Sequence, residues 1–289
     1  MKRLIVNGDD FGFTTGVNAG TLRAYRDGIL TSATIMANGA AFEEAIEIAR
    51  SNPGLGVGCH LVLVGERPAA RAEEVASLVD KNGFMPGTLG EFATRLSRGL
   101  ISSDHIEREL SAQVQKVIRA GITPTHLDTH KHTHLHPKVM KAVVRIAVQF
   151  GIRRVRRPFQ SMRDGARGPA AREAQTVYFK QRLKSLATQV TRPLFNSLTS
   201  RNGIRTPDRF FGVSLTGLLD AESMEQLLGE TREGTTEIMC HPGVYDQDLE
   251  QAHTMLKQSR QRELEALTNQ SVRDAIAERG INLISYREL

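Results

Sequence analysis

The stretch KRLIVNGDDFGFTTGVNAGTLRAYRDG, residues 2–28, contains the pattern that decides the fold. Residues 3–7 carry a short apolar run, which is typical of a buried strand, and the polar sequence GDDFG follows as a loop. Residues 17–26 indicate a helix, and Asp27 and Gly28 provide the signal that ends it. A buried strand followed by a helix is the repeating unit of a parallel sheet or barrel.

The same alternation continues along the rest of the chain. The residues expected in strands are 32–36, 56–64, 125–128, 153–156, 237–240 and 282–285. The residues expected in helices are 41–50, 104–120, 137–150 and 272–278. We see neither an internal repeat nor a low-complexity linker. The alternation therefore predicts an α/β protein built on a parallel sheet or barrel.

Length and composition limit the class of protein. The 289 residues suffice for one large α/β barrel or two ordinary domains, and 40% hydrophobic with 24% charged residues is typical of a soluble globular protein. The two cysteines, Cys59 and Cys240, cannot form a disulfide framework, so we expect a cytoplasmic protein. The apolar run at residues 4–6 is too short for a signal-peptide core, and no window is long enough for a membrane span.

Positive charge is concentrated in one region. The net charge is +6, and residues 151–210 contain fourteen Arg or Lys against three Asp or Glu. A basic balance indicates an anionic partner, which can be nucleic acid, a phosphate group or a membrane surface. The 5% aromatic content, the lack of tryptophan and the lack of a recognition motif argue against nucleic acid.

Residues that can bind metals or transfer protons follow three of the expected strands and lie within a fourth, which contains His60. They are the pair Asp9–Asp10, His60, the stretch HLDTHKHTHLHP at residues 126–137 and His241. That stretch alone holds five of the nine histidines. In a parallel barrel the carboxyl ends of the strands carry the active site, so we expect these side chains to meet there.

Each of these residues also has an ordinary structural interpretation. Adjacent carboxylates usually point apart, so one of Asp9 and Asp10 can bind a metal while the other acts as a base, but Asp is also common in turns. A single histidine in an apolar strand, such as His60, is more often a core residue than a ligand. Because neighbours in a strand face opposite ways, only one of Cys59 and His60 can face the site. We interpret both cysteines as small hydrophobic residues on the outer face.

The histidine cluster cannot place every ring on one metal, because a catalytic site uses about three protein ligands. His130 follows Asp128 by two residues and shares its side if the segment is extended, and His132 and His134 continue that side. We expect one ligand, with neighbours that orient it or touch substrate, while His126 and His136 would cap helices or face solvent. Two histidines and a carboxylate are typical of a hydrolytic or oxygenase centre, and the lack of a cofactor motif favours hydrolysis.

Five motifs occur in an order that resembles a known family. The motifs NGDDFG, TSATIMANG, GVGCHLVLVGERP, THLDTHKHTHLHP and EIMCHPGVYD are similar to those of the YdjC-like carbohydrate deacetylases, which include chitooligosaccharide deacetylases. The resemblance runs from Lys2 to the C-terminal RGINLISYREL. HLVLVGERP followed by SLVDKNGFM is similar to the hopanoid-biosynthesis-associated branch, which is implied to remove acetyl from an N-acetylglucosaminyl hopanoid lipid. One departure is Gly8, where the family usually has alanine.

The resemblance implies a fold, a cofactor and roles for the candidate residues. The implied fold is a distorted (β/α) TIM-like barrel, a single domain over residues 1–289 with a basic amphipathic insertion at about 160–210. The implied cofactor is one divalent metal ion, zinc or magnesium. The implied roles are metal ligands for Asp10, His60 and His130, general base for Asp9, general acid for His241, a partner of Asp9 for Arg156, and substrate or supporting contacts for Asp128, His132 and His134.

The basic segment at residues 176–198 has two interpretations. Phe179, Leu183, Leu186 and Val190 lie at helical spacing, and Pro193 should end or kink the helix. The stripe can pack on the barrel, or it can form an amphipathic lid that meets a lipid substrate at an anionic membrane surface. The second interpretation predicts a glycolipid partner and a peripheral position at the inner membrane surface. A soluble oligosaccharide substrate would need neither an amphipathic lid nor a position at the membrane. The sequence is also compatible with a homodimer.

Two further functions compete with the deacetylase. Asp and His residues together with an excess of arginine also suit a metal-dependent phosphoesterase, although the chain offers few carboxylates for a two-metal site. A basic nucleic-acid-binding or metal-storage protein is the alternative outside enzymes.

Overall fold

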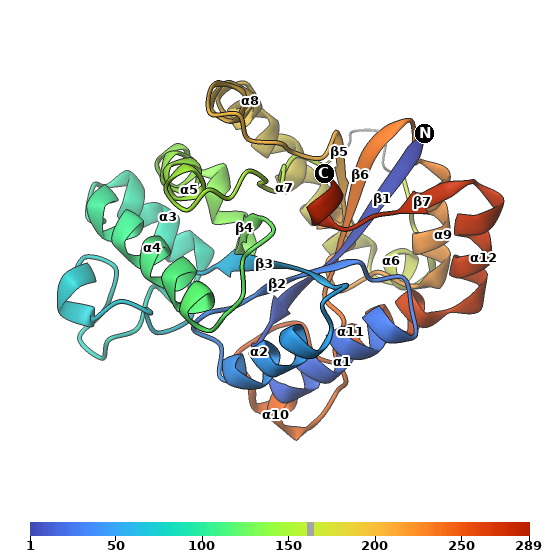
Figure 1. Ribbon diagram of the computed structural model, residues 1–289, viewed down its shortest axis with the longest axis horizontal. Coiled ribbons are helices and arrows are strands. Elements are labelled where there is room, and N and C mark those ends of the chain that lie inside the picture. Colours follow the sequence, from blue (N-terminus) through green and yellow to red (C-terminus); the bar gives the residue numbers. More distant parts are fainter. Residues whose placement is uncertain (161–164) are drawn as a thin grey trace.

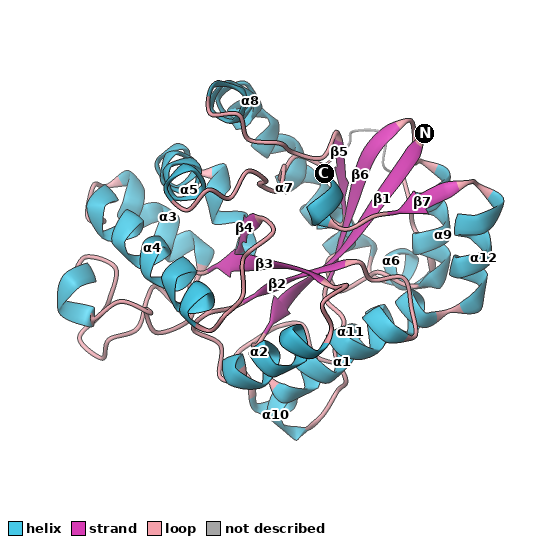
Figure 2. Cartoon of the chain, in the orientation of Figure 1, coloured by secondary structure: helices cyan, strands magenta, loops and turns pink. Residues whose placement is uncertain are grey.

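The computed structural model describes residues 1–160 and 165–289, and its sheet contains seven strands over these residues (Figures 1 and 2). The strands are β1 Lys2–Phe11, β2 Ser32–Ile35, β3 Gly56–Leu61, β4 Leu127–Thr129, β5 Arg209–Phe211, β6 Gly234–Cys240 and β7 Ile281–Leu283. Their order is β4-β3-β2-β1-β6-β5, with β7 paired to β1, and every pairing is parallel. The prediction of an α/β protein with a parallel sheet is confirmed.

Strand β1 is the centre of the sheet, because three other strands pair with it. β6 pairs along residues 2–8 of β1, while β7 pairs with residues 2–4 and β2 with residues 7–11 on its other edge. The sheet curls beyond β4 through two isolated bridges, Leu127–Val155 and Arg154–Arg205. The strand expected at residues 153–156 is reduced to these bridges. The result is the distorted TIM-like barrel that the resemblance implied, with both chain ends at the same end of β1 (Figure 1).

Helices cover the outside of the curled sheet (Figure 2). The larger helices are α1 Thr15–Arg26, α2 Phe42–Ser51, α3 Leu89–Ser97, α4 Ser103–Arg119, α5 Pro137–Gln149, α9 Ala221–Gly229, α11 Gln258–Thr268 and α12 Gln270–Glu278. The short ones are α6 Pro169–Glu173 and α10 Gln247–Gln251. The five helices expected at residues 17–26, 41–50, 104–120, 137–150 and 272–278 are confirmed, whereas α3, α9 and α11 were not predicted.

Helix α4 shows how the sequence specifies these elements. The Ser102 hydroxyl accepts a hydrogen bond from the Asp104 amide and caps the first turn. Ile106, Leu110 and Val114 are fully buried against the sheet. Burial of each such side chain contributes about 1.5–3 kcal/mol, so the amphipathic stripe fixes both the helix and its orientation.

The two faces of the sheet have opposite character. Leu4 and Val6 of β1 face outward into the main apolar core beneath the helices, and Cys59 and Cys240 are buried in the same core. Cysteines in this position pack as small hydrophobic side chains, as the sequence interpretation expected. Asn7 and the carboxylates that follow it lie on the inner face, so the interior of the barrel is polar where the site forms.

The basic segment forms two helices with a break between them. They are α7 Gln175–Ala187 and α8 Arg192–Arg201, joined by a turn at Thr188–Thr191, and Pro193 lies in the first turn of α8. Phe179, Leu183 and Val190 are 52%, 69% and 83% exposed. Three of the four stripe residues therefore face solvent, whereas Leu186 is half-buried and Tyr178 and Ser185 of the same helix are buried. Residues 161–164 of the predicted insertion lie outside the described residues.

A membrane span does not occur among the described helices, because none is both long and apolar enough.

Candidate metal centre and active site

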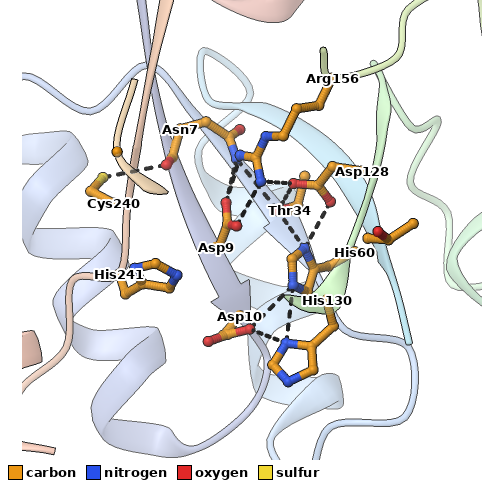
Figure 3. A network of polar contacts seen from close by, with 12 residues as sticks. Asn7, Asp9, Asp10, Thr34, His60, Asp128, His130, Arg156, Cys240 and His241 are labelled. Carbon is orange, nitrogen blue, oxygen red and sulfur yellow. Dashed lines mark hydrogen bonds and ion pairs between the residues drawn. The ribbon is translucent and has the colours of Figure 1, made fainter. Parts of the chain in front are cut away.

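The Asp9–Asp10 pair lies inside β1, which corrects the expectation that the pair follows the strand. β1 continues to Phe11, and its pairing with β2 shifts register between Gly8 and Phe11. Asp10 has a φ of +65°, a left-handed conformation that Asp tolerates better than most residues. Such a bulge changes the direction of a side chain, so both carboxylates line one cavity although neighbours in a strand normally point apart (Figure 3).

Three side chains form a cluster of metal-binding type. Asp10 Oδ1 lies 3.2 Å from His60 Nε2 and 3.0 Å from His130 Nδ1, and the two nitrogens lie 3.3 Å apart. Zinc bonds of about 2.0–2.1 Å in tetrahedral geometry place ligand atoms roughly 3.3 Å from one another. The three donors therefore fit one divalent cation, and the structure brings together the three residues that the resemblance implied as ligands (Figure 3).

Asp128 orients His60 from the side opposite this cluster. Its Oδ1 lies 2.7 Å from His60 Nδ1, while Oδ2 accepts a hydrogen bond from Thr34 Oγ1 at 3.0 Å. A carboxylate on one ring nitrogen fixes the tautomer and directs the other nitrogen to the metal. Burial lowers the pKa of His60, but Asp128 and Asp10 outweigh burial and raise it to about 10. The surroundings of this ring thus stabilise positive charge.

Arg156 is the central cation of the polar network. Nη1 and Nη2 donate to the two oxygens of Asp9 at 2.6 Å each, and Nε donates to Glu237 Oε1 at 2.8 Å. Nη1 also lies 2.7 Å from Asp128 Oδ2. Burial would raise the pKa of Asp9, but the guanidinium outweighs burial and holds it well below its usual range. Asp9 is therefore ionised at neutral pH. Glu237 differs from Asp9, because burial raises its pKa to about 7.

A second group of potential metal ligands is already neutralised by the Arg156 guanidinium. Asp9, His60 and Asp128 also place ligand atoms within 4.8 Å of one another. Arg156 pairs with both of these carboxylates and is completely buried. Its guanidinium supplies the positive charge that a second metal would bring, so the geometry fits one metal.

His241 follows β6 and lines the cavity with the two aspartates. Its backbone amide donates to Glu263 Oε2 at 2.5 Å, and its Nδ1 lies 3.6 Å from the same oxygen. Burial lowers the pKa of His241, but Glu263 and the two aspartates outweigh burial and raise it. The ring therefore keeps a proton more readily than a free imidazole does.

The expectation that His132 and His134 continue an extended segment after His130 is wrong. Residues 130–135 form a turn in which Lys131 and His132 have φ values of +53° and +52°. His132 still reaches the cavity and packs against Phe210 with ring centroids 5.7 Å apart. His134 turns back, and its Nδ1 lies 2.5 Å from the Thr129 hydroxyl. His134 is therefore placed to support the turn, not to touch a substrate.

The two outer histidines of the cluster differ from each other. His136 accepts a hydrogen bond from the Lys138 amide and caps α5, as expected. His126 is buried, stacks on Tyr286 at 3.5 Å and lies 3.1 Å from Asn7 Oδ1 through its Nε2, so the expectation of capping or exposure is wrong for it. Its role is to fill the barrel below the site.

A cavity of about 780 Å³ opens above the polar cluster. Its buried end is formed by the candidate metal ligands, Asp9 and His241, and its walls include Val64 and Val213. Leu89 and Met255, which are 42% and 96% exposed, form part of its rim. Helix α7 contributes Gln181 and Lys184. The cavity therefore joins a charged end to a mixed rim that includes two exposed apolar side chains, and α7 forms part of its wall.

Several site residues were missed from the sequence. Arg260 donates to Asp10 Oδ2 at 2.6 Å, and Glu263 contacts His241. Both come from α11, where they share one face with Leu264 and Leu267. Two charged residues on the otherwise apolar face of this helix were the sequence signal that could have identified them. Glu66, whose pKa burial raises to about 6, lines the cavity; it lies in the GVGCHLVLVGERP motif but was not singled out as a site residue.

The fold and the site define an α/β barrel whose polar centre lies at the carboxyl ends of its strands, beside a cavity large enough for a small ligand. Residues 3–278 match the family described as YdjC-like protein, and the chain belongs to that family.

Relatives with known names match almost the whole chain. A carbohydrate deacetylase of Geobacillus stearothermophilus is 37% identical over 98% of this chain and 96% of its own length. One of Brevibacillus brevis is 33% identical over 99% of both chains. Among solved structures, an Enterococcus faecalis V583 protein named for the cleavage of cellobiose phosphate has a TM-score of 0.80 at 29% identity, covering 99% of this chain and 98% of that chain.

Proposed function

We propose that the chain is a metal-dependent carbohydrate N-deacetylase that removes the acetyl group from an N-acetylglucosamine-bearing substrate. The observation that carries this proposal is the Asp10–His60–His130 triangle, with Asp9 and His241 beside it in one cavity. Relatives named carbohydrate deacetylase over nearly the full chain support the same activity.

Each residue of the site has a role in hydrolysis of an acetamide. Asp10, His60 and His130 would hold the cation, which as a Lewis acid would polarise the acetyl carbonyl. Asp9, kept ionised by Arg156, takes a proton from the attacking water. His241 gives its proton to the sugar nitrogen as the carbon–nitrogen bond breaks. Acetate and a free amino sugar are the products.

The same observations support a deacetylase over the phosphoesterase. A two-metal phosphoesterase needs a second cation close to the first. Arg156 fills that place, since it pairs with Asp9, Asp128 and Glu237. One metal and a raised pKa at His241 suit amide hydrolysis, in which a poor leaving group must be protonated.

We propose further that the substrate is a glycolipid of the N-acetylglucosaminyl hopanoid type, met at the inner membrane surface. Two observations support this. The cavity combines a charged end with a rim at which two apolar side chains, Leu89 and Met255, are exposed. Helix α7, part of the cavity wall, exposes Phe179 and Leu183 next to lysines, an arrangement that binds anionic lipid surfaces. A chitooligosaccharide such as diacetylchitobiose is the alternative substrate.

Acetate release by the metal-loaded protein tests the activity. The variants Asp10→Asn and His60→Ala should lose metal and turnover together. Asp9→Asn should keep metal, because Asp9 bonds Arg156 and not the triangle. Full turnover by Asp9→Asn would show that Asp9 is not the base. If no acetylated sugar releases acetate with any of several metals, the deacetylase is rejected and the phosphoesterase is favoured.

The substrate is tested by comparing N-acetylglucosaminyl hopanoid in anionic vesicles with diacetylchitobiose. The double variant Phe179→Ser, Leu183→Ser should raise KM for the lipid about tenfold and leave chitobiose turnover unchanged. Ile118→Ser, Val148→Ser is the matched control, because it removes two exposed apolar side chains from α4 and α5. Equal losses on both substrates would reject the lipid. A change in sedimentation instead would show that the stripe joins a homodimer.

A further inference from the structure

Helix α11 places two charged side chains in the interior of the protein. Its sequence QSRQRELEALT is mostly polar, yet Arg260 and Glu263 are each only 1% exposed. They lie three residues apart and therefore share one face of the helix. A buried charge is costly unless it has a specific partner, so the contacts of these two residues indicate what they do.

Arg260 is bound to the Asp10 carboxylate. Its Nη2 donates to Oδ2 at 2.6 Å, and its Nε donates to the Leu256 carbonyl at 3.1 Å. The other carboxylate oxygen, Oδ1, faces His60 and His130. Arg260 therefore determines which oxygen of Asp10 completes the triangle, at a residue whose left-handed backbone already restricts it.

Glu263 is bound to the segment that carries His241. Oε2 accepts the His241 amide at 2.5 Å, and Oε1 accepts the Gly217 amide at 3.1 Å. Two backbone donors hold this carboxylate in place, with Oε2 3.6 Å from His241 Nδ1. A fixed negative charge there favours a proton on Nδ1 and orients the ring in the cavity.

We propose that α11 carries two positioning residues that act on separate parts of the site. Arg260 sets the metal affinity through Asp10, and Glu263 sets the proton donor through His241. The inference rests on the proposed deacetylase function, and it assigns the two residues different measurable effects. If α11 only stabilised the fold, replacing either residue would change zinc affinity and kcat in the same way.

The test uses Arg260→Met and Glu263→Gln in the full chain, with Arg262→Met and Glu265→Gln as controls. The control residues are exposed on the same helix and carry the same charges. Arg260→Met should weaken zinc binding, measured by competition with a chromogenic chelator, by about 10–100-fold, and saturating zinc should restore its kcat. Glu263→Gln should bind zinc within about twofold of the wild type and lose about 100-fold in kcat at an unchanged KM.

A spectroscopic measurement separates orientation from folding. In ¹⁵N-histidine-labelled protein, Glu263→Gln should move the His241 Nδ1 signal away from its protonated position, and Arg260→Met should not. If Arg260→Met does not fold, Arg260→Lys is the alternative. It keeps the positive charge but lacks the planar guanidinium with its several donors, so it should also show weaker zinc binding. Equal losses of zinc affinity and kcat in both variants, or unchanged zinc affinity without Arg260, would overturn the proposal. A wild type that binds zinc but releases no acetate would instead refute the deacetylase.

Discussion

Replacement of Arg156 by methionine tests whether this side chain holds the barrel interior together. Methionine keeps much of the length of arginine but has neither charge nor donors. Its introduction would leave Asp9, Asp128 and Glu237 buried without their shared cation. Removal of one partner of a buried ion pair costs about 3–5 kcal/mol, and three carboxylates depend on this one group. We therefore expect a loss of roughly 5 kcal/mol in the free energy of unfolding.

The loss should depend on pH in a defined direction. In the variant Asp9 and Glu237 lose the cation that lowers their pKa values, so both take up protons more readily and their pKa values in the folded state rise above those of the unfolded chain. The penalty is then largest above these raised values and shrinks as the pH falls. In the wild type the stabilisation from Asp9, whose pKa is held low, persists at any pH above its unfolded value of about 4. The difference between the two proteins should therefore narrow between pH 8 and pH 5.5.

Thermal melting of chelator-treated protein measures this effect without a contribution from metal. A loss of 5 kcal/mol corresponds to a decrease in Tm of roughly 8 °C for a chain of this size. Arg153→Met is the control, since Arg153 lies three residues earlier, is exposed, and its side chain donates to a backbone carbonyl, that of Asn202. A variant that melts within 3 °C of the wild type at pH 8, or a deficit that grows at pH 5.5, would refute the reasoning.

Two further predictions concern the histidines of the site. Asp128→Asn removes the carboxylate that orients His60, so zinc affinity should fall about 10–100-fold in chelator competition; unchanged affinity would show that Asp128 is not needed for orientation. Because His241 has a raised pKa and must be protonated to act as the acid, kcat should stay high above the pH at which a free imidazole loses its proton. The high-pH limb of the profile should move to lower pH in Glu263→Gln, and an unmoved limb would contradict the assignment.

Local sequence patterns predicted a parallel α/β sheet or barrel, and the family resemblance implied the distorted barrel and the roles of the site residues. Short apolar runs marked the strands, and Asp or His at their carboxyl ends marked the cavity, because a parallel barrel brings those ends together. His60 illustrates the limit of that argument. Its position in an apolar strand fits a core residue equally well, and only the three-dimensional contacts, with Asp128 at 2.7 Å and His130 at 3.3 Å, place it in a group that could hold a metal.

Contacts between distant segments explain what the sequence did not reveal. Arg260 lies 250 residues from Asp10, and no local pattern indicates that pairing. The turn after His130 depends on two consecutive left-handed residues, Lys131 and His132, which are neither glycine nor asparagine. An extended segment was the expectation there because side-chain alternation was the available rule, and tertiary packing overrode it.

The bulge at Asp10 explains how two adjacent carboxylates can have different chemistry. In a regular strand Asp9 would face the interior and Asp10 the apolar layer beneath the helices, where an ionised carboxylate would be costly. The left-handed turn at Asp10 brings it back to the cavity, with Arg260 as its cation, while Asp9 has Arg156. Each carboxylate thus has its own buried arginine, and only Asp10 also faces the two histidine nitrogens. In the proposed deacetylase this difference, more than the sequence of the pair, would make Asp10 the metal ligand and Asp9 the base.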